Sequence, residues 1–491
     1  MKRTSIRLLT ISYILTVTAC TVGPDYQRPT NITSTTFKEL KGWKQAKPHD
    51  NELPEKWWAI FKDPYLNSLE EQVNTTNQSI AQAEAQYRQS QSLVQTATAA
   101  YFPTATGTAT VNRFRAASGQ NVAVRGVKYL FGAALSAAWE PDLWGSVRRQ
   151  VESSEASAQA SAATLQALRL STQATLAQNY FLLRVFDAQI KLLNNTTKTY
   201  EKTLKITQNR YAVGMAAKAE VVQAEAQLES AQAQEINIGV QRAQLEHAIS
   251  VLIGKAPAEL SIPIAPLNNL IPPIPVTIPS ELLERRPDIA IAERQVAAAN
   301  AQIGVAKAAY FPTLNLAATN GTQSSRLSSL LSSAARYWAL GPAALAIPLF
   351  DGGLRGAQMQ QTIDAYDASV AAYRQAVLTS FQEVEDNLAA LRILEQELLV
   401  QTKAVESSRK AVLLTTNQYQ AGTLSYLNVM VDQAAALANE KTAVDLQGER
   451  LAAAVLLIKA LGGGWNVAAL PTKDEVGGDV KWSQFLPIPL N

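Results

Sequence analysis

The segment AAYFPT occurs twice in this chain, at residues 99–104 and 308–313, about 209 positions apart. Further pairs of similar segments follow in the same order at nearly the same spacing: SIAQAEAQ (79–86) with DIAIAERQ (288–295), NRYAVG (209–214) with NQYQAG (417–422), and LIGK (252–255) with ALGG (460–463). A constant offset between ordered markers is typical of an internal repeat. The sequence therefore predicts a duplicated unit of about 209 residues.

Both units show the same order of segments, which predicts their domain boundaries. The first unit spans 65–255 and the second 280–465, and each begins with a helical approach, at 65–100 and 280–309. A β-hairpin is expected next, at about 102–140 and at about 311–350, followed by a long helix pair whose reversal lies near Gly214 or Gly422. The connector 256–279 is rich in proline, which forbids a regular helix there.

The hairpin segments have the residue alternation of two-faced strands. In TATGTATVN (104–112) the even positions are polar and the odd ones are small or apolar, which is the period-2 pattern of a β-strand. Aromatic residues are placed to lie near a membrane interface in the two hairpins: Tyr129, Phe131, Trp139, Tyr337 and Trp338. Two hairpins supply four strands, whereas the smallest membrane barrels have about eight. A barrel built from this material must be shared among copies of the chain.

The segments after the hairpins predict helices of unusual length. Residues 147–209 contain neither proline nor glycine, and about 60 helical residues span on the order of 90 Å. Their apolar positions are mostly alanine and their other faces carry Gln, Glu and Lys. A narrow apolar seam of this kind suits a hollow helical barrel or a solvated coiled-coil stalk. The hairpins inserted before each helix pair favour the barrel.

The N-terminus is typical of a bacterial lipoprotein. Residues 1–19 combine a basic start with a short apolar stretch, as in a signal peptide, and Cys20 follows as the only cysteine of the chain. Cys20 is therefore expected to carry a covalent lipid, and a lipoprotein with Thr21 rather than Asp at the next position is expected in the outer membrane. Residues 20–64 are expected to be extended and equatorial, and 466–491 to form an equatorial tail.

The composition argues against an enzyme and against a nucleic-acid-binding protein. The chain has 44 Lys and Arg against 41 Asp and Glu, a balance without the strong positive charge that nucleic-acid binding requires. Its two histidines lie in unrelated contexts, and neither GKAP (254–257) nor LGGGW (461–465) has phosphate-loop spacing. We therefore expect no catalytic residue, no metal site and no cofactor other than the lipid on Cys20.

Several ordered segments carry a resemblance to a known family. They are TVGPDYQRP (21–29), WWAIFKDPYLNSL (57–69), ELLERRPDIAIAE (281–293), both AAYFPT copies, IPLFDGGLRG (347–356), NQYQAGTLSYLNV (417–429) and ALGGGW (460–465). Together with TAC at residues 18–20, they closely resemble the outer membrane factor family. Its members are TolC-like and OprM-like outer-membrane subunits, including the NodT lipoproteins, of tripartite resistance-nodulation-division efflux systems.

The resemblance implies a membrane α+β fold and a homotrimer. Each chain would contribute four strands to a twelve-stranded transmembrane β-barrel, continued by a long α-helical periplasmic barrel. The implied partners are a periplasmic adaptor protein, an inner-membrane pump of the resistance-nodulation-division type and the outer-membrane lipid. The channel would conduct drugs or other small toxic molecules passively. A type I protein-secretion duct and a lipid-anchored periplasmic scaffold are the alternative functions.

The resemblance also assigns roles to particular residues. Around Gly214 and Gly422, with Tyr211 and Tyr419, the tip turns would contact the adaptor. The periplasmic gate would follow the second turn, at Tyr426, Leu427, Val431 and Asp432. Leu427 matches the apolar gate position, whereas Val431 occupies the acidic one and Asp432 lies one residue, or about 100° of helix rotation, further on. Four residues of the AAYFPT copies would mark the boundary between barrel and helices: Tyr101, Pro103, Tyr310 and Pro312.

Overall fold

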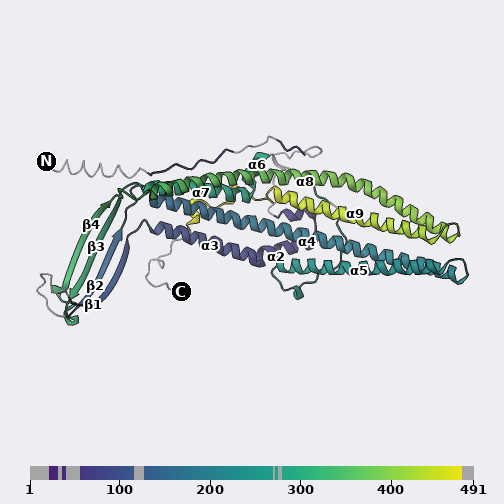
Figure 1. Ribbon diagram of the computed structural model, residues 1–491, viewed down its shortest axis with the longest axis horizontal. Coiled ribbons are helices and arrows are strands. Elements are labelled where there is room, and N and C mark those ends of the chain that lie inside the picture. The colour runs from purple at the N-terminus through teal and green to yellow at the C-terminus, as the bar shows by residue number, and fades with distance from the viewer. Residues whose placement is uncertain are drawn as a thin grey trace.

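A sheet at one end and a body of long helices at the other give the protein an elongated shape (Figure 1). The computed structural model describes residues 21–30, 36–39, 56–115, 127–268, 271–274 and 279–477. The predicted signal peptide, Cys20 and the last part of the predicted tail lie outside these residues. None of the described helices combines the length and the apolarity that a membrane-spanning helix requires.

The two repeats form helices of matching length. Helices α4 (Ser146–Ala212) and α8 (Leu354–Gln420) have 67 residues each, and both start directly after a glycine with positive φ. Each chain segment then reverses and returns as a 35-residue helix, α5 (Lys218–Leu252) or α9 (Tyr426–Ala460). The two reversals lie at the end of the molecule farthest from the sheet (Figure 1). The structure thus contains the long helix pairs that the proline-free and glycine-poor sequence predicts.

Each helical approach is divided into two helices, which the sequence analysis did not predict. The first consists of α2 (Pro64–Thr76) and α3 (Gln78–Ala99), and the second of α6 (Pro279–Arg285) and α7 (Pro287–Ala308). The break in each has a local cause: Asn77 caps α3 by accepting from the Ile80 amide, and Pro287 directly follows Arg286. The returning helix α5 ends against the start of α3, and α9 ends against the start of α7.

Hydrogen bonds at these two joints satisfy the last carbonyls of the returning helices. Asn77 Nδ2 donates to the carbonyl of Leu252 at 2.7 Å, and its Oδ1 accepts from the Ile80 amide at 3.0 Å. At the equivalent joint, Arg286 Nη1 donates to the carbonyl of Ala460 at 3.0 Å. The shorter helices therefore continue end to end into α3 and α7.

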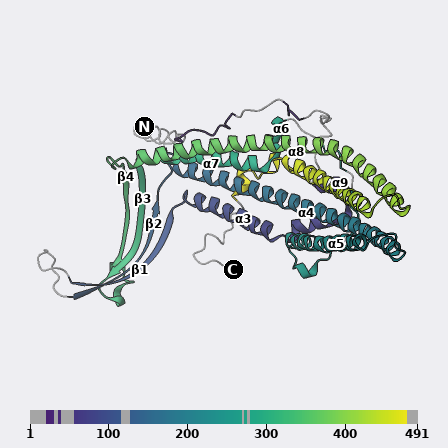
Figure 2. The ribbon, with the colours of Figure 1, turned by 45° about the vertical axis from the view of Figure 1, so that its right-hand side comes forward.

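The four strands form one antiparallel sheet in the order β1-β2-β3-β4. They are β1 (Thr104–Arg115), β2 (Val127–Trp139), β3 (Thr313–Ser324) and β4 (Arg336–Ala346). The β2–β3 pairing joins the two repeats, and the strands leave the helices together as one curved sheet (Figure 2). Within the described residues, β1 and β4 each have a strand neighbour on one side only.

Both AAYFPT copies lie between a helix and a strand. Helix α3 ends at Ala99 and β1 begins at Thr104, while α7 ends at Ala308 and β3 begins at Thr313. Neither copy continues as a helix, because its proline has no amide hydrogen and clashes with the preceding turn. The repeated string therefore marks equivalent positions in the two halves.

The main core surrounds the middle of α4. The short helix η2 (Trp57–Phe61) and α2 pack there, with Trp57, Trp58, Phe61, Leu66, Leu69, Tyr180 and Phe181 all buried. The carboxylate of Asp187 is fully buried and accepts from Arg184 at 2.8 Å, from Arg242 at 2.7 Å and from the backbone amide of Ala265 at 3.2 Å. These bonds hold the proline-rich connector against α4 and α5.

Residues 21–30 form an extended strap along α4, α7 and α8. Arg149 on α4 is buried and its Nη2 donates to Asp25 at 2.7 Å, while Arg28 Nε donates to the hydroxyl of Tyr373 at 3.0 Å. The Val22 amide donates to the carbonyl of Trp144 at 3.0 Å. The start of the strap, Thr21, lies against Gly145, between the end of β2 and the start of α4.

Candidate functional site at the helical tip

The helical tip consists of two turns that share one backbone geometry. Gly214 has φ +77° and Gly422 has φ +79°, a left-handed conformation that glycine adopts without steric cost. In both turns the glycine amide donates to the carbonyl three residues earlier, at 2.9 Å to Tyr211 and 3.0 Å to Tyr419. The Tyr-x-x-Gly segments therefore allow each long helix to reverse into its shorter partner.

The two tyrosines of these turns differ in their surroundings. Tyr211 is 46% exposed, whereas Tyr419 is 1% exposed and packs edge-to-face on Tyr426 with 5.8 Å between ring centroids. Tyr419 and Tyr426 belong to a small buried cluster with Ala224 and Val429. Both buried rings thus join the α8–α9 hairpin to the α4–α5 hairpin.

The hydroxyls of the buried tyrosines extend this contact to α5. Tyr419 donates to Glu220 Oε2 at 3.0 Å, and Tyr426 donates to Gln227 Oε1 at 2.7 Å. Burial raises the pKa of both phenols above the ordinary value. They therefore remain neutral hydrogen-bond donors throughout the physiological pH range.

The first turn of α9 places aliphatic side chains on the surface. Leu427 is 52% exposed and Val431 is 56% exposed, and four residues apart they share one helix face. Asp432 is half-buried and lies about 100° around the helix from Val431. The face shared by Leu427 and Val431 therefore presents no carboxylate at the position where the resemblance would place one.

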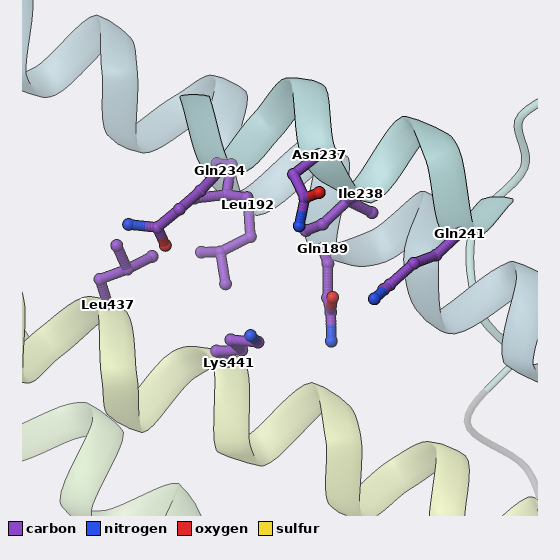
Figure 3. Close-up of a pocket in the computed structure, with 9 residues that line it drawn as sticks. Gln189, Leu192, Gln234, Asn237, Ile238, Gln241, Leu437 and Lys441 are labelled. Carbon is purple, nitrogen blue, oxygen red and sulfur yellow. The ribbon is translucent and has the colours of Figure 1, made fainter. Parts of the chain in front are cut away.

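Between the tip and the middle of the molecule, a narrow space separates α5 from α9, and α4 closes it on a third side (Figure 3). This cavity has a volume of about 120 Å³. Amide side chains from α4 and α5 point into it opposite Lys441 of α9: Gln189, Gln234, Asn237 and Gln241. Nearer the tip it adjoins a wider groove of about 790 Å³, lined by Tyr200, Met430 and Val431 among others.

The described part of these surfaces contains no candidate metal site. Within the part of the chain that the structure describes, no cluster of three His, Cys, Asp or Glu side chains could hold a metal ion. The polar groups around the cavity are mainly amides, which have no useful proton-transfer chemistry near neutral pH. What the arrangement can do is position two helical hairpins relative to each other.

The boundary residues are held by two tryptophans that the sequence analysis did not assign to this role. Trp139 Nε1 donates to the carbonyl of Tyr101 at 3.0 Å, and Trp144 Nε1 donates to the carbonyl of Pro312 at 2.7 Å. The peptide after each AAYFPT proline then enters its strand, at Thr104 or Thr313. The second bond connects the two repeats, because Trp144 precedes α4 and Pro312 precedes β3.

Similarity to known proteins decides the family of the chain. Residues 69–255 and 278–463, which correspond to the two repeats, match the outer membrane efflux protein family. The chain belongs to the outer membrane efflux protein family. It is 30% identical to the outer membrane protein OprJ of Pseudomonas aeruginosa over 95% of this chain and 97% of OprJ. It is also 30% identical to the toluene efflux pump outer membrane protein TtgI of Pseudomonas putida, over 93% of this chain and 97% of TtgI.

Solved structures of related channels have the same fold. The outer-membrane channel OprN superposes with a TM-score of 0.85 at 30% identity, covering 91% of this chain and 100% of that chain. The open state of the MtrE outer membrane channel from Neisseria gonorrhoeae superposes with a TM-score of 0.80 at 28% identity, covering 91% and 99%. The predicted membrane α+β channel fold is confirmed. This protein is an outer-membrane efflux channel subunit with a large periplasmic part.

Proposed function

We propose that three copies of this chain form one passive duct for small toxic molecules. The observation that carries the proposal is the sheet, in which β1 and β4 each have an unpaired edge among the described residues. Open edges in a membrane leave backbone groups without hydrogen-bond partners, so the strands must close with those of other copies. Three four-stranded sheets would give a twelve-stranded barrel. The 67-residue helices α4 and α8 would line the tunnel that continues it.

The partners are proposed to be a periplasmic adaptor at the tip and an inner-membrane pump of the resistance-nodulation-division type. The turn at Gly214 supports an adaptor contact because its apolar side chains are open to solvent: Tyr211 is 46% exposed, Val213 69% and Met215 62%. Buried Tyr419 would have a different role, because it packs inside the tip and supports the Gly422 turn without contacting the adaptor. Relatives named as toluene, solvent and antibiotic efflux proteins favour small organic substrates over secreted proteins.

A lipid on Cys20 would anchor each copy in the outer membrane. This proposal is supported by the position of Thr21, which lies beside Gly145 at the level where sheet and helices meet. An acyl group on the neighbouring residue would begin within one residue of that boundary, close enough to enter the bilayer. The mass of the N-terminal peptide of the mature protein tests this, since an unmodified Cys20 would contradict it.

The gate is proposed to be a ring of Leu427 side chains, reinforced by Val431 one helical turn further. Their exposure in a single copy fits side chains that meet around a threefold axis. Apolar rings close a pore by excluding water from it. Replacing Leu427 with alanine should widen the ring and raise the single-channel conductance of purified protein in planar bilayers at least about twofold.

The control is Leu414→Ala, which removes an equally exposed leucine from α8 away from the turn (51% against 52% exposed). Its conductance should equal that of the unmodified protein. A preparation that forms no channel at all would contradict the proposed duct. Equal conductance of the Leu427→Ala variant and the unmodified protein would remove Leu427 from the gate and leave the duct intact.

A further inference from the structure

Arg210 connects the two tip turns through three kinds of contact. Its Nη1 donates to the carbonyls of Tyr419 at 2.8 Å and of Gln420 at 3.1 Å, which are among the last carbonyls of α8. Its guanidinium carbon lies 4.7 Å from the centroid of the Tyr419 ring. Its Nη2 approaches the carbonyl of Met215, in its own turn, at 3.5 Å.

The electrostatics of this position favour a cation. Arg210 lies in the last turn of α4 and also contacts the end of α8, so the negative ends of two helix dipoles converge on its charge. Within the described residues, no carboxylate lies within ion-pair distance of Arg210. The carbonyls and the face of the Tyr419 ring are therefore the groups that its charge meets.

Only the first repeat supplies an arginine at this position. The residue equivalent to Arg210 in the second repeat is Gln418, which has no charge and cannot make a reciprocal contact of this kind. The guanidinium also packs against Gly422, where a Cβ would lie at an ordinary van der Waals distance of 3.7 Å from Arg210 Nη2. The first hairpin thus holds the turn of the second.

We propose that Arg210 is a positioning residue of the gate. By binding the end of α8 it fixes the turn at 421–425, and with it the first turn of α9, which carries Leu427 and Val431. The proposal rests on the proposed gate, because a latch matters only where the α8–α9 hairpin moves to open the pore. Losing Arg210 would loosen the turn at 421–425, while the bonds of Tyr419 and Tyr426 to α5 would still hold the hairpin itself.

The test measures single-channel currents of the full-length, purified protein in planar bilayers. Arg210→Ala should increase the open fraction about tenfold, since it removes two charge-assisted hydrogen bonds and a cation–π contact. Arg210→Lys keeps the charge but loses the planar stacking, so its open fraction should lie between those of the unmodified protein and of Arg210→Ala. Arg409→Ala is the matched control, because Arg409 pairs with Glu440 inside the α8–α9 hairpin and does not touch the first one.

Hydrogen–deuterium exchange supplies a readout that a general loss of stability would not mimic. In Arg210→Ala, amide exchange should rise at residues 419–425 and stay unchanged at the distant α5–α3 joint. An open fraction equal to that of the unmodified protein, or exchange that rises equally along α4, would overturn the proposal. Absence of channels in the unmodified protein would instead refute the proposed duct, so the two failures are distinguishable.

Discussion

Among the described residues, Glu70 is a carboxylate whose surroundings are poorly suited to a charge. It lies on the same buried face of α2 as Leu66, Leu69 and Val73 and has no exposed surface. Both of its oxygens are buried without a hydrogen-bond partner. Burial alone raises its pKa well above the ordinary value, so folding favours the protonated form.

This predicts a pH dependence of stability that belongs to Glu70. A group whose pKa is raised by folding contributes its full stability below the unfolded pKa of about 4.3, and loses it as the pH rises toward the folded value. Glu70→Gln keeps the shape and removes the proton equilibrium. The melting temperature of Glu70→Gln, relative to that of the unmodified protein, should therefore increase as the pH rises from 5 to 9.

The comparison between these two proteins cancels the titration of all other groups. Glu71, which pairs with Lys56 on the exposed side of α2, provides a control substitution, Glu71→Gln. The melting-temperature difference between Glu71→Gln and the unmodified protein should change little over the same pH range, because exposed ion pairs contribute little stability. A difference for Glu70→Gln that stays constant with pH would show that Glu70 does not titrate in this range.

The two helix joints align α5 end to end with α3, and α9 end to end with α7. At each joint a glycine passes close to the end of the first approach helix, α2 or α6: a Cβ on Gly254 would lie 2.2 Å from the carbonyl oxygen of Thr76, and one on Gly462 would lie 2.0 Å from that of Arg285. Both glycines have positive φ, +69° and +95°. The two repeats thus place a glycine of the same backbone conformation at equivalent positions of their joints.

We predict that Gly462→Ala destabilises the protein by at least about 2 kcal/mol, because it combines backbone strain with a collision against main chain. Thermal unfolding followed by circular dichroism measures this. The control is Gly239→Ala in the middle of α5, where a Cβ would meet nothing within 4 Å. There alanine should stabilise the helix by about 0.5–1 kcal/mol. Equal melting temperatures for the two variants would contradict the role assigned to the joint.

Sequence reasoning succeeded where structure follows from neighbouring residues. Long runs without proline or glycine predict the helices, period-2 alternation predicts the strands, and the repeat predicts that both occur twice. The breaks at Asn77 and Arg286 were missed although an N-cap residue and Pro287 mark them in the sequence. The bonds of these two residues to the carbonyls of residues 252 and 460 were missed because the partners lie far away in the chain. The contact of Arg210 with Tyr419 was missed for the same reason. Its one visible sign was the mismatch between Arg210 and Gln418 in otherwise similar segments.

On the scale of the whole channel, each residue of the proposed gate would act as a ring. A threefold assembly multiplies one side chain by three, so a single carboxylate per chain places three negative charges around one aperture. The exposed face of α9 carries Leu427 and Val431 and no such charge, while Asp432 is half-buried on a different face. The unmodified channel is therefore expected to discriminate weakly between cations and anions at this level.

Val431→Asp should convert the aperture into a cation-selective one. Rings of acidic side chains attract cations and repel anions in a narrow pore, where the effective dielectric constant is low. The reversal potential across a potassium chloride gradient measures the ratio of cation to anion permeability, which should rise several-fold and fall again at high salt because of screening. Asp432→Asn serves as the matched control and should leave the reversal potential unchanged. If instead Asp432→Asn abolishes an existing cation preference, Asp432 faces the pore and the orientation assigned to α9 is wrong.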